Sequence, residues 1–480
     1  MQPPAAAPMR EDVTADIAVI GAGLVGAAIA RELAGSQLRV VLVEARADVG
    51  DGTSKANTAI LHTGFDATPG TLESRLVARG HHLLADYAAR TGIPVERTGA
   101  LLVAWTDEEL EALPRLKAKA EANGYDACRL VTADQVYDVV PDLGEGALGG
   151  LTVPDESIVC TWTTTLALAT DAVRRGAVLL RGHRVAEVRP PQRPADPTVL
   201  VTGRGDVTAR WVVNAAGLGS DHLDRMLGHE RFTVTPRRGE LIVFDKLTRP
   251  KVPTIVLPVP SSRGKGVLVS PTIYGNVMLG PTAEDLADRS DTGTSERGLE
   301  LLVEKGRRLM PSLMDEEVTA TYAGLRAAID AGDYLIDLDA EQRYLLVAGI
   351  RSTGLTAAMA IAEHVTGMLT DAGLDLAPRD DLPEPPRMPQ LGEAGVRPYQ
   401  DAERIADDPS YGHIVCFCER VTAGEIRDAC RSTIPPADLD GLRRRTRALN
   451  GRCQGFYCGA RVRALLAGGG VDRPPSQGAP

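Results

Sequence analysis

The chain has 480 residues, a formal net charge of −11 and 44% hydrophobic residues. This length predicts roughly two to three domains, and the acidic balance argues against a general affinity for nucleic acid or anionic membranes. No apolar run approaches the ~18 residues that a membrane span requires, and residues 1–12 lack the apolar core of a signal peptide, so we expect a cytoplasmic protein.

The first predicted unit is a strand, a tight turn, a helix and a second strand between residues 16 and 46. Ile17–Ile20 is a short apolar run typical of a buried strand, Leu24–Leu33 has helical spacing, and Val40–Val43 is the second strand. The glycines of the turn follow G-x-G-x-x-G spacing and are Gly21, Gly23 and Gly26.

These glycines have expected roles in a tight turn, a close backbone approach to a pyrophosphate, and close packing of helix on strand. Glu44 stands at the end of the second strand, where its carboxylate can bind a ribose hydroxyl. An ordinary Gly-rich turn is the alternative for the glycines alone, but the complete order of elements favours a dinucleotide site.

A polar, Gly-rich loop follows, at the edge where an open α/β sheet places the phosphates and second ring system of a dinucleotide. Its polar members are Thr53, Ser54 and Asn57. Leu72–Arg90 then has helical spacing with Thr71 as a plausible N-cap. In chain order we next expect a strand at 97–105, a helix at 107–123, an irregular segment at 136–153 and a helix at 161–175.

A second signature lies at Trp211–Ser220, an apolar strand that ends in Asn-Ala-Ala-Gly. Small residues such as Ala216 and Gly217 suit packing against a cofactor, although a buried strand before a turn is the alternative. From 232 to 282, short apolar runs between Gly and Pro predict an inserted antiparallel sheet. Later we expect a helix at 295–310, a strand at 344–349 and a helix at 354–369.

Cysteine is unevenly distributed, and five of the seven cysteines crowd the C-terminus after a Pro- and charge-rich linker at 371–408. Cys416-x-Cys418 and Cys453-x4-Cys458 form two local pairs, and four thiolates can bind Zn²⁺ or an iron–sulfur cluster. C-x-C is unusual for structural zinc, and free thiols are the third alternative. Cys430 falls inside a predicted helix, where we expect it to pack.

Four features resemble the D-amino-acid-oxidase-like flavoproteins: the G-x-G-x-x-G turn, Glu44 with Arg46, S-K-A-N at 54–57 and I-L-H-T-G at 60–64. His62-Thr63-Gly64 is close to the branch of anaerobic glycerol-3-phosphate dehydrogenases and L-2-hydroxyglutarate dehydrogenases. The resemblance covers about residues 15–370 and implies bound FAD. The residues implied to contact FAD are Gly21, Gly23, Gly26, Glu44, Arg46, Thr53, Ser54, Asn57, Ala216, Gly217, Gly354 and Leu355.

The resemblance implies an α/β fold with an α+β cap, in which a Rossmann-like FAD-binding domain carries an inserted antiparallel substrate-cap sheet. The implied FAD-binding parts are about 15–95, 150–230 and 322–370, and the implied cap is about 96–149 and 231–321. Residues 1–14 and 467–480 are expected to be flexible tails.

The C-terminal string, including Glu419, Val421-Thr422 and Arg445-Thr446-Arg447, resembles the bacterioferritin-associated-ferredoxin-like domain. This resemblance implies a small helical 2Fe–2S domain at 409–466. Its implied ligands are Cys416, Cys418, Cys453 and Cys458. The arginines from 443 to 452 are expected to stabilise the cluster or to form a docking face, with an ordinary solvated face as the alternative.

Two side chains are candidates for catalysis. His62 is a candidate base beside the flavin, with a structural or flavin-contacting role as the alternative. Arg326, in a G-L-R segment, is a candidate anion anchor, with a surface ion pair as the alternative. Arg238 and Lys265 are weaker candidates for an anionic substrate, and Tyr274 departs from the His common in this branch, which leaves the substrate identity open.

The resemblance implies an FAD-dependent dehydrogenase for a small anionic alcohol, with glycerol 3-phosphate favoured and electrons passed onward through the cluster. The alternatives are an L-2-hydroxy acid, an amino acid or amine, and a non-catalytic electron-transfer subunit. We expect the electron acceptor to be a quinone or a one-electron acceptor that is reached through a partner subunit. Any peripheral attachment to a membrane is expected to go through that partner, and no binding of nucleic acid is expected. A cluster that only braces the fold is the alternative to a relay.

Overall fold

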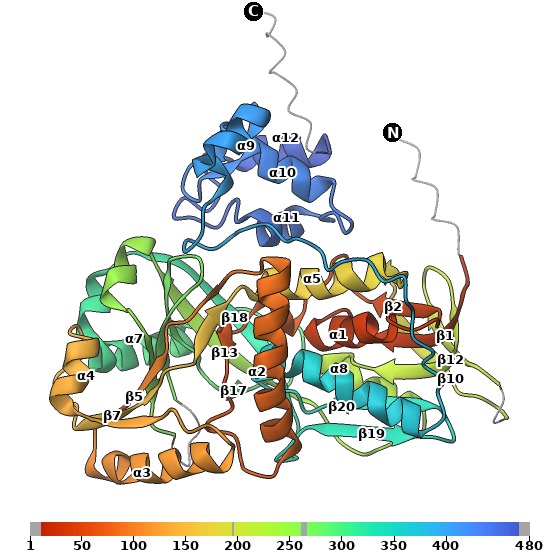
Figure 1. Ribbon diagram of the computed structural model, residues 1–480, viewed down its shortest axis with the longest axis horizontal. Helices are drawn as coiled ribbons and strands as arrows, with labels where there is room; N and C mark the ends of the chain where they lie inside the picture. Colours follow the sequence, from red (N-terminus) through yellow and green to blue (C-terminus); the bar gives the residue numbers. More distant parts are fainter. Residues whose placement is uncertain (1–10, 194–195, 261–265, 470–480) are drawn as a thin grey trace, which may run out of the picture.

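The computed structural model describes residues 11–193, 196–260 and 266–469, and Figure 1 shows a broad body with a small C-terminal domain above it. The expected tail 1–14 is partly wrong, because the first strand already begins at Val13. Residues 1–10, residues 470–480 and Lys265 lie outside the described residues. In the described part of the chain, no helix is long and apolar enough to cross a membrane.

The first sheet has eight strands and a parallel centre, as expected for a Rossmann-like domain. Its parallel strands are β9 (Val178–Arg181), β2 (Val40–Glu44), β1 (Val13–Ile20), β12 (Val207–Asn214) and β20 (Tyr344–Ala348). Two strands pair antiparallel with this centre, β11 (Thr198–Thr202) with β12 and β19 (Leu335–Asp339) with β20. A third, β10 (Val185–Arg189), pairs antiparallel with β11. The register pairs Ile20, the last residue of β1, with Asn214, the last residue of β12. The glycine-containing turns that follow these two strands therefore lie at the same edge of the sheet.

Helices pack beside this sheet through apolar faces. They are α1 (Leu24–Leu33), α2 (Leu72–Thr91), α5 (Thr161–Arg174) and α8 (Gly354–Asp371), with α6 (Ser220–Met226) against the opposite face. The expected helices at 24–33, 72–90 and 354–369 are therefore present, and Thr71 caps α2 by accepting from Ser74 N–H. Short elements near the sheet are η1 (Thr53–Lys55), β3 (Ile60–Leu61), β4 (Val95–Glu96), β8 (Ser157–Val159) and η2 (Gly217–Gly219).

The second sheet has nine strands and forms the expected cap. Its strands are β5 (Ala100–Ala104), β6 (Arg129–Thr132), β7 (Gly149–Val153), β13 (Thr235–Phe244), β14 (Ile255–Pro258), β15 (Leu268–Pro271), β16 (Val277–Gly280), β17 (Glu284–Asp285) and β18 (Val318–Ala328). The sheet is antiparallel except where β14 runs parallel to β5. It also continues to Ala328, past the boundary at 321 expected from the sequence.

Helices and short turns complete the cap: α3 (Asp107–Ala122), α4 (Ala133–Val139), α7 (Glu296–Leu309), η3 (Lys246–Lys251) and η4 (Pro311–Asp315). The expectation of an irregular segment at 136–153 was wrong, because this stretch contains most of α4 and all of β7. The sequence signal for these two elements is weak. The helix α4 is short and buries only Val136, and β7 begins with two glycines, which favour neither strand nor helix.

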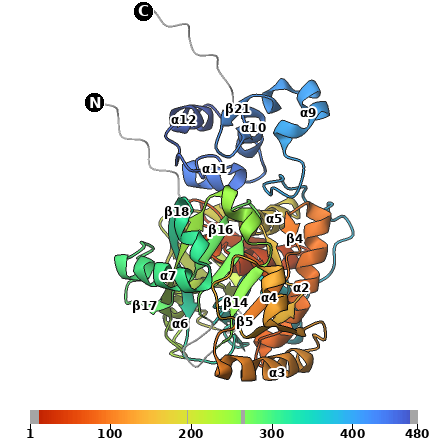
Figure 2. The same cartoon turned by 90° about the vertical axis from the view of Figure 1, so that its left-hand side faces the viewer.

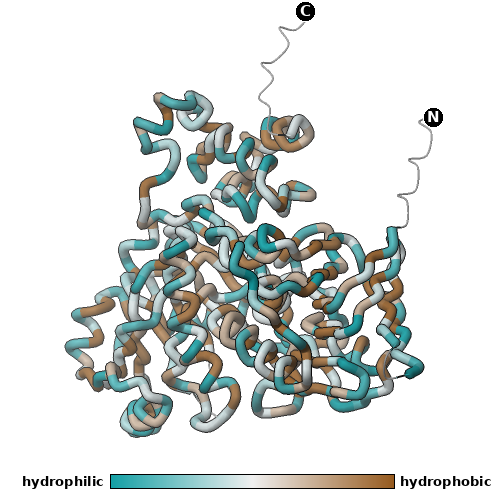
Figure 3. Tube along the Cα trace, turned by 45° about the vertical axis from the view of Figure 1, so that its right-hand side comes forward, coloured by the Kyte–Doolittle hydropathy of each residue, from teal (hydrophilic) through white to brown (hydrophobic). Residues whose placement is uncertain are grey.

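The C-terminal domain is small and mainly helical, as expected. Its elements are η5 (Pro398–Gln400), α9 (Ala402–Asp407), η6 (Pro409–Tyr411), β21 (Ile414–Cys416), β22 (Val421–Thr422), α10 (Ala423–Cys430), α11 (Leu439–Thr446) and α12 (Gly459–Ala467). It has its own cluster of buried residues, and Figure 3 shows hydrophobic segments inside both the body and this domain. In Figure 1 and Figure 2 alike, α11 is the helix nearest the body.

The segment from 371 to 408 is docked along the body rather than hanging free. Pro378 forms a bridge with Ser36, and Met388 N–H donates to Thr91 O at 2.8 Å. From Arg397 onward it packs with the C-terminal domain, because the buried Arg397 guanidinium contacts Glu425. The C-terminal unit therefore begins before residue 409.

Candidate functional site

The turn from β1 to α1 leaves no room for side chains. Gly21 has a φ of 102°, and a Cβ there would lie 2.6 Å from the carbonyl oxygen of Ala215. A Cβ on Gly26 would lie 1.8 Å from the carbonyl oxygen of Gly21. The first glycine therefore allows the turn to meet the end of β12, and the third allows α1 to pack on the turn.

Two polar side chains converge on the first turn of α1. Glu44 accepts hydrogen bonds from Ala22 N–H (2.8 Å) and Arg46 N–H (2.7 Å), and burial raises its pKa. Ser54 Oγ accepts from Leu24 N–H at 3.0 Å. Glu44 and Ser54 thus hold the glycine turn and the start of α1 in place. A helix N-terminus with a carboxylate beside it suits the pyrophosphate and ribose of a dinucleotide, so these residues fit FAD.

The other residues expected to contact FAD surround this edge. Thr53 Oγ1 donates to Leu325 O at 2.8 Å, and Asn57 Nδ2 donates to Ser54 O at 3.0 Å. Ala216 and Gly217 follow β12, while Gly354 and Leu355 open α8. Arg46 is half-exposed and lies 3.6 Å from Asp51. Most of these side chains shape the loop around the site, and Arg46 faces outward from it.

His62 is held by a glutamate that the sequence analysis missed. Its Nδ1 lies 3.1 Å from Glu156 Oε2, and its backbone N–H donates to Thr356 Oγ1. Glu156 is fully buried, and its other oxygen accepts from Thr63 N–H (2.8 Å) and Thr63 Oγ1 (3.0 Å). A carboxylate that only accepts places the proton on Nδ1, which leaves Nε2 as the basic nitrogen. No sequence signal marks Glu156, which lies in the short loop between β7 and β8.

Arg326 projects from β18 on the same side as Tyr322 and Gly324, because alternate strand residues share a face. Tyr322 donates to Asn57 O at 3.1 Å, so this face points toward the FAD-binding loop. The guanidinium reaches only Thr282 O, at 3.5 Å, and within the described residues no carboxylate pairs with it. Burial, then Arg237, lowers the pKa of Arg326. A half-buried cation without a carboxylate partner is stabilised by an anionic ligand.

Arg238, a weaker candidate for binding an anionic substrate, already has acidic partners. Its guanidinium is paired with Glu284 at 2.6 Å and with Asp291 at 3.2 Å. Arg238 is thus neutralised by its own acidic partners, whereas the surface-ion-pair alternative for Arg326 finds no carboxylate partner among the described residues. His62 and Arg326 make no direct contact among the described residues, so their common site is a proposal developed below.

The two cysteine pairs meet at a pair of tight loops. A Cβ on Gly451 would lie 2.3 Å from Cys418 Cβ, so the second loop presses on the first. The pKa of Cys453 is lowered, mainly by a hydrogen bond from Tyr457 N–H, whereas burial raises the pKa of Cys458 to about 12. Backbone N–H groups aimed at sulfur stabilise a thiolate, which is the state of a cysteine that binds iron.

No group of three or more His, Cys, Asp or Glu in the described ranges is arranged to hold one metal ion. A 2Fe–2S cluster takes two thiolates on each of two irons, so it calls for two pairs rather than a set around one ion. All seven cysteines lie without a disulfide. Cys430, at the end of α10, packs against the domain core as expected.

Backbone strain is concentrated in these loops. Six non-glycine residues of the described chain have positive φ, and four of them are Arg420, Arg447, Leu449 and Gln454. Such conformations cost roughly 1–3 kcal/mol each and persist where the surrounding structure fixes them, which is typical of ligand-holding loops. The geometry fits a cluster site.

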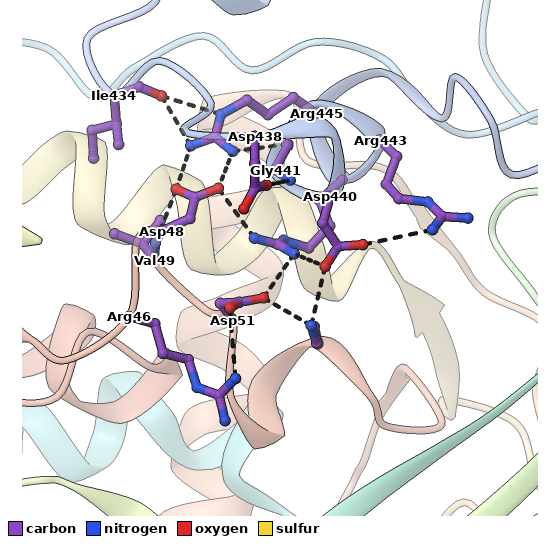
Figure 4. A network of polar contacts seen from close by, with 12 residues as sticks. Arg46, Asp48, Val49, Asp51, Ile434, Asp438, Asp440, Gly441, Arg443 and Arg445 are labelled. Carbon is purple, nitrogen blue, oxygen red and sulfur yellow. Dashed lines mark hydrogen bonds and ion pairs between the residues drawn. The ribbon is translucent and has the colours of Figure 1, made fainter. Parts of the chain in front are cut away.

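An ion-pair network joins the C-terminal domain to the loop that follows β2, and Figure 4 shows it from close by. Asp48 accepts from Arg445 at 2.5 and 2.8 Å and from Arg444 at 3.1 Å. Arg444 also reaches Asp51 at 2.9 Å, and Lys55 pairs with Asp440 at 3.1 Å. The solvated-face alternative for this arginine stretch is therefore wrong, because its docking partner is the body of the same chain.

A second contact across this interface is a stack of Arg447, Tyr274 and Trp162. The Arg447 guanidinium lies 4.1 Å from the Tyr274 ring centroid, and the Tyr274 and Trp162 centroids are 5.0 Å apart. Trp162 Nε1 donates to Lys55 O at 3.0 Å, and Arg447 Nε donates to Glu419, next to Cys418, at 3.1 Å. Tyr274 therefore contacts the cysteine domain through Arg447.

A cavity of about 350 Å³ lies beside the stack. Its lining combines the loop around Asn57, the cap sheet and the C-terminal domain, and includes Trp162, Tyr274, Tyr322, Arg447 and Gln454. The residue after Cys453 thus borders the same cavity as the FAD-binding loop.

Comparison with protein families identifies both units. Residues 16–368 match the model described as FAD dependent oxidoreductase, and residues 414–468 match the BFD-like [2Fe-2S] binding domain. Both resemblances noted in the sequence are confirmed.

Relatives cover nearly the whole chain. A glycerol 3-phosphate dehydrogenase of Caloramator mitchellensis is 34% identical over 94% of this chain and 94% of its own. One component of the anaerobic glycerol-3-phosphate dehydrogenase of Escherichia coli (strain K12) is 26% identical over 95% of this chain and 89% of its own. Among solved structures, the L-alpha-glycerophosphate oxidase of Mycoplasma pneumoniae with FAD bound has a TM-score of 0.73 at 26% identity, over 78% of this chain and 99% of that one.

Proposed function

Because the chain belongs to the FAD-dependent oxidoreductase family and ends in a BFD-like 2Fe–2S domain, we propose that it dehydrogenates glycerol 3-phosphate. The observation that carries the choice of an anionic alcohol is Arg326, a half-buried guanidinium without a carboxylate partner in the described chain. A phosphate accepts bidentate hydrogen bonds from guanidinium. The names of the relatives support phosphate over carboxylate.

The cofactors are FAD and a 2Fe–2S cluster. We propose that FAD is held by the G-x-G-x-x-G turn, Glu44, Ser54 and the first turn of α8, and the cluster by the four paired cysteines. When bound, FAD supplies hydride acceptance and the cluster supplies single-electron transfer.

Within this chain, His62 is proposed to receive the hydroxyl proton of the substrate at Nε2. Glu156 fixes the imidazole by accepting from Nδ1 and is itself fixed by Thr63. A buried carboxylate also stabilises the imidazolium that results, as in other carboxylate–histidine pairs. Arg326 is proposed to orient the anionic end of the substrate, so that the alcohol carbon is presented consistently.

We propose that electrons leave through the cluster to a one-electron acceptor or to a quinone served by a partner subunit. The position of the cysteine domain supports a relay, because Arg447 and Tyr274 place the Cys418 loop against the FAD-binding body. A cluster that only braces the fold would not require contact with the FAD-binding loop. Reduced cysteines without disulfides fit a reducing compartment such as the cytoplasm.

The test is an anaerobic substrate screen with the purified holoprotein. Glycerol 3-phosphate is expected to bleach the flavin absorbance, whereas L-2-hydroxyglutarate and amino acids are expected to leave it unchanged. Bleaching by L-2-hydroxyglutarate alone would reassign the substrate. Bleaching only by a reduced partner protein would favour a non-catalytic electron-transfer subunit.

A further inference from the structure

A buried glutamate lies beside the cysteine loops and is paired with two cations. Glu419 directly follows Cys418 and is 1% exposed. Its Oε2 accepts from Arg447 Nε at 3.1 Å, and Lys246 Nζ lies 3.1 Å from the same oxygen. A Cβ on Gly451 would lie 3.2 Å from Oε1 of this carboxylate, so the glutamate also borders the second cysteine loop. One buried carboxylate therefore adjoins both loops that carry the cysteine pairs.

The two cations come from different parts of the chain. Arg447 is the C-cap residue of α11 in the C-terminal domain, whereas Lys246 is the first residue of η3 in the cap. Their side chains are only 7% and 21% exposed, so salt screens these pairs little. Lys246 also pairs with Glu393 at 2.7 Å, but Glu393 has a second cation in Arg420 at 2.9 Å. The pairing of Lys246 with Glu419 therefore exists only while the C-terminal domain is docked on the body.

Stability alone does not explain this arrangement, because a buried ion pair is often no more stabilising than apolar side chains of similar volume. The charges do bear on the neighbouring cluster site. A 2Fe–2S cluster held by four thiolates is net negative, and its reduction adds one more negative charge. A buried anion beside the site disfavours this added charge, and a cation favours it. Lys246 and Arg447 thus offset the effect of Glu419.

We propose that Lys246 raises the reduction potential of the cluster by neutralising Glu419 when the C-terminal domain is docked. This inference rests on the proposed function, since it concerns the electrons that reduced FAD passes to the same cluster. On reduction the cluster gains one electron from reduced FAD, and no bond or proton changes at the cluster. Lys246 acts through Glu419 and is a positioning residue. Because it stands on the body, the cluster is easiest to reduce in the docked state, in which it faces the electron donor.

The test is a chemical reductive titration of the purified holoprotein, with the reduced cluster followed by electron paramagnetic resonance. Lys246→Met removes the cation, Lys246→Arg keeps it, and Glu419→Gln removes the anion while keeping the shape. The matched control is Lys251→Met at the other end of η3, where Lys251 pairs with Glu316 at 2.6 Å. The titration needs no substrate, so a failed substrate screen refutes the proposed substrate without touching this result.

We expect Lys246→Met to shift the equilibrium between oxidised and reduced cluster about tenfold toward the oxidised form, or about 59 mV for one electron. Glu419→Gln should shift it by a similar factor in the opposite direction. Lys246→Arg and Lys251→Met should keep the wild-type potential. Opposite shifts from the two charge removals separate an electrostatic role from a structural one, since a loosened site would change both in the same direction.

Four results would overturn the proposal. The first is a wild-type potential in Lys246→Met, and the second is a shift of the same sign in Lys246→Met and Glu419→Gln. The third is an equal shift in Lys246→Met and in either Lys246→Arg or Lys251→Met. The fourth is loss of the cluster absorbance from Lys246→Met, which would show that the lysine holds the site together and does not tune it.

Discussion

The substitution Asp48→Asn tests how the cysteine domain is held on the body. Asp48 is buried and neutralises Arg444 and Arg445, which are also buried. The change keeps the shape but removes the charge. Breaking a buried pair by removing one partner costs about 3–5 kcal/mol, because the remaining charge is left without compensation. Arg444 keeps Asp51 and Asp440, so the loss falls on Arg445 and should lie near the lower value.

A loss of about 3 kcal/mol raises the population of undocked domain by about a hundredfold, since each 1.4 kcal/mol is tenfold. Hydrogen exchange of the α11 backbone amides measures this population directly. The control is Glu363→Gln, which removes an exposed pair with Arg79 and should cost less than about 1 kcal/mol. Exchange of α11 at the wild-type rate in Asp48→Asn, or an equal change in the control, would refute the reasoning.

Four further predictions follow from the site and the fold. Glu156→Gln should lower kcat by about 10²–10³-fold with FAD still bound, because the imidazole of His62 loses its orienting acceptor; an unchanged kcat in steady-state assays would contradict this. Arg326→Ala should lower kcat/KM by about 10–100-fold through KM, and equal KM values would exclude it as the anchor. Cys453→Ser should remove most cluster absorbance, whereas Cys430→Ser should not. Burial acts to raise the pKa of Asp221, but Arg289 and other donors lower it to about 2. The ionised carboxylate therefore stabilises the folded chain by about 2 kcal/mol above about pH 4, and this contribution is lost toward pH 2. A difference in unfolding free energy between wild type and Asp221→Asn that stays constant over this range would contradict the assignment.

The dinucleotide-binding unit could be predicted from sequence because short-range patterns of apolar residues and glycines define it. The bounds of α1 were recovered at Leu24 and Leu33, because apolar periodicity and glycine spacing are local signals. The C-terminal domain was likewise recognisable, because its two cysteine pairs and the residues around them resemble a known 2Fe–2S family. The stretch at 136–153 was missed because α4 is short and buries only Val136, and because β7 begins with two glycines.

The pairings that build the site were not visible, because they join residues far apart in the chain. Glu156 and His62 are 94 positions apart, and Asp48 and Arg445 are 397 apart. In sequence, Asp48 and Glu156 are ordinary acids in loops, and only the fold buries them. The contact of Tyr274 with Arg447 is of the same kind, since 173 positions separate the two residues. Such roles depend on which surfaces the fold brings together, and no local pattern encodes this.

The central claim is that electrons from an anionic alcohol pass through FAD to the cluster of the same chain. Electron paramagnetic resonance of the holoprotein after anaerobic addition of glycerol 3-phosphate tests it most directly. We expect the flavin to bleach and the signal of the reduced 2Fe–2S cluster then to appear, without any added partner. A cluster that stays oxidised while the flavin is fully bleached, over many turnovers with dye, would contradict it.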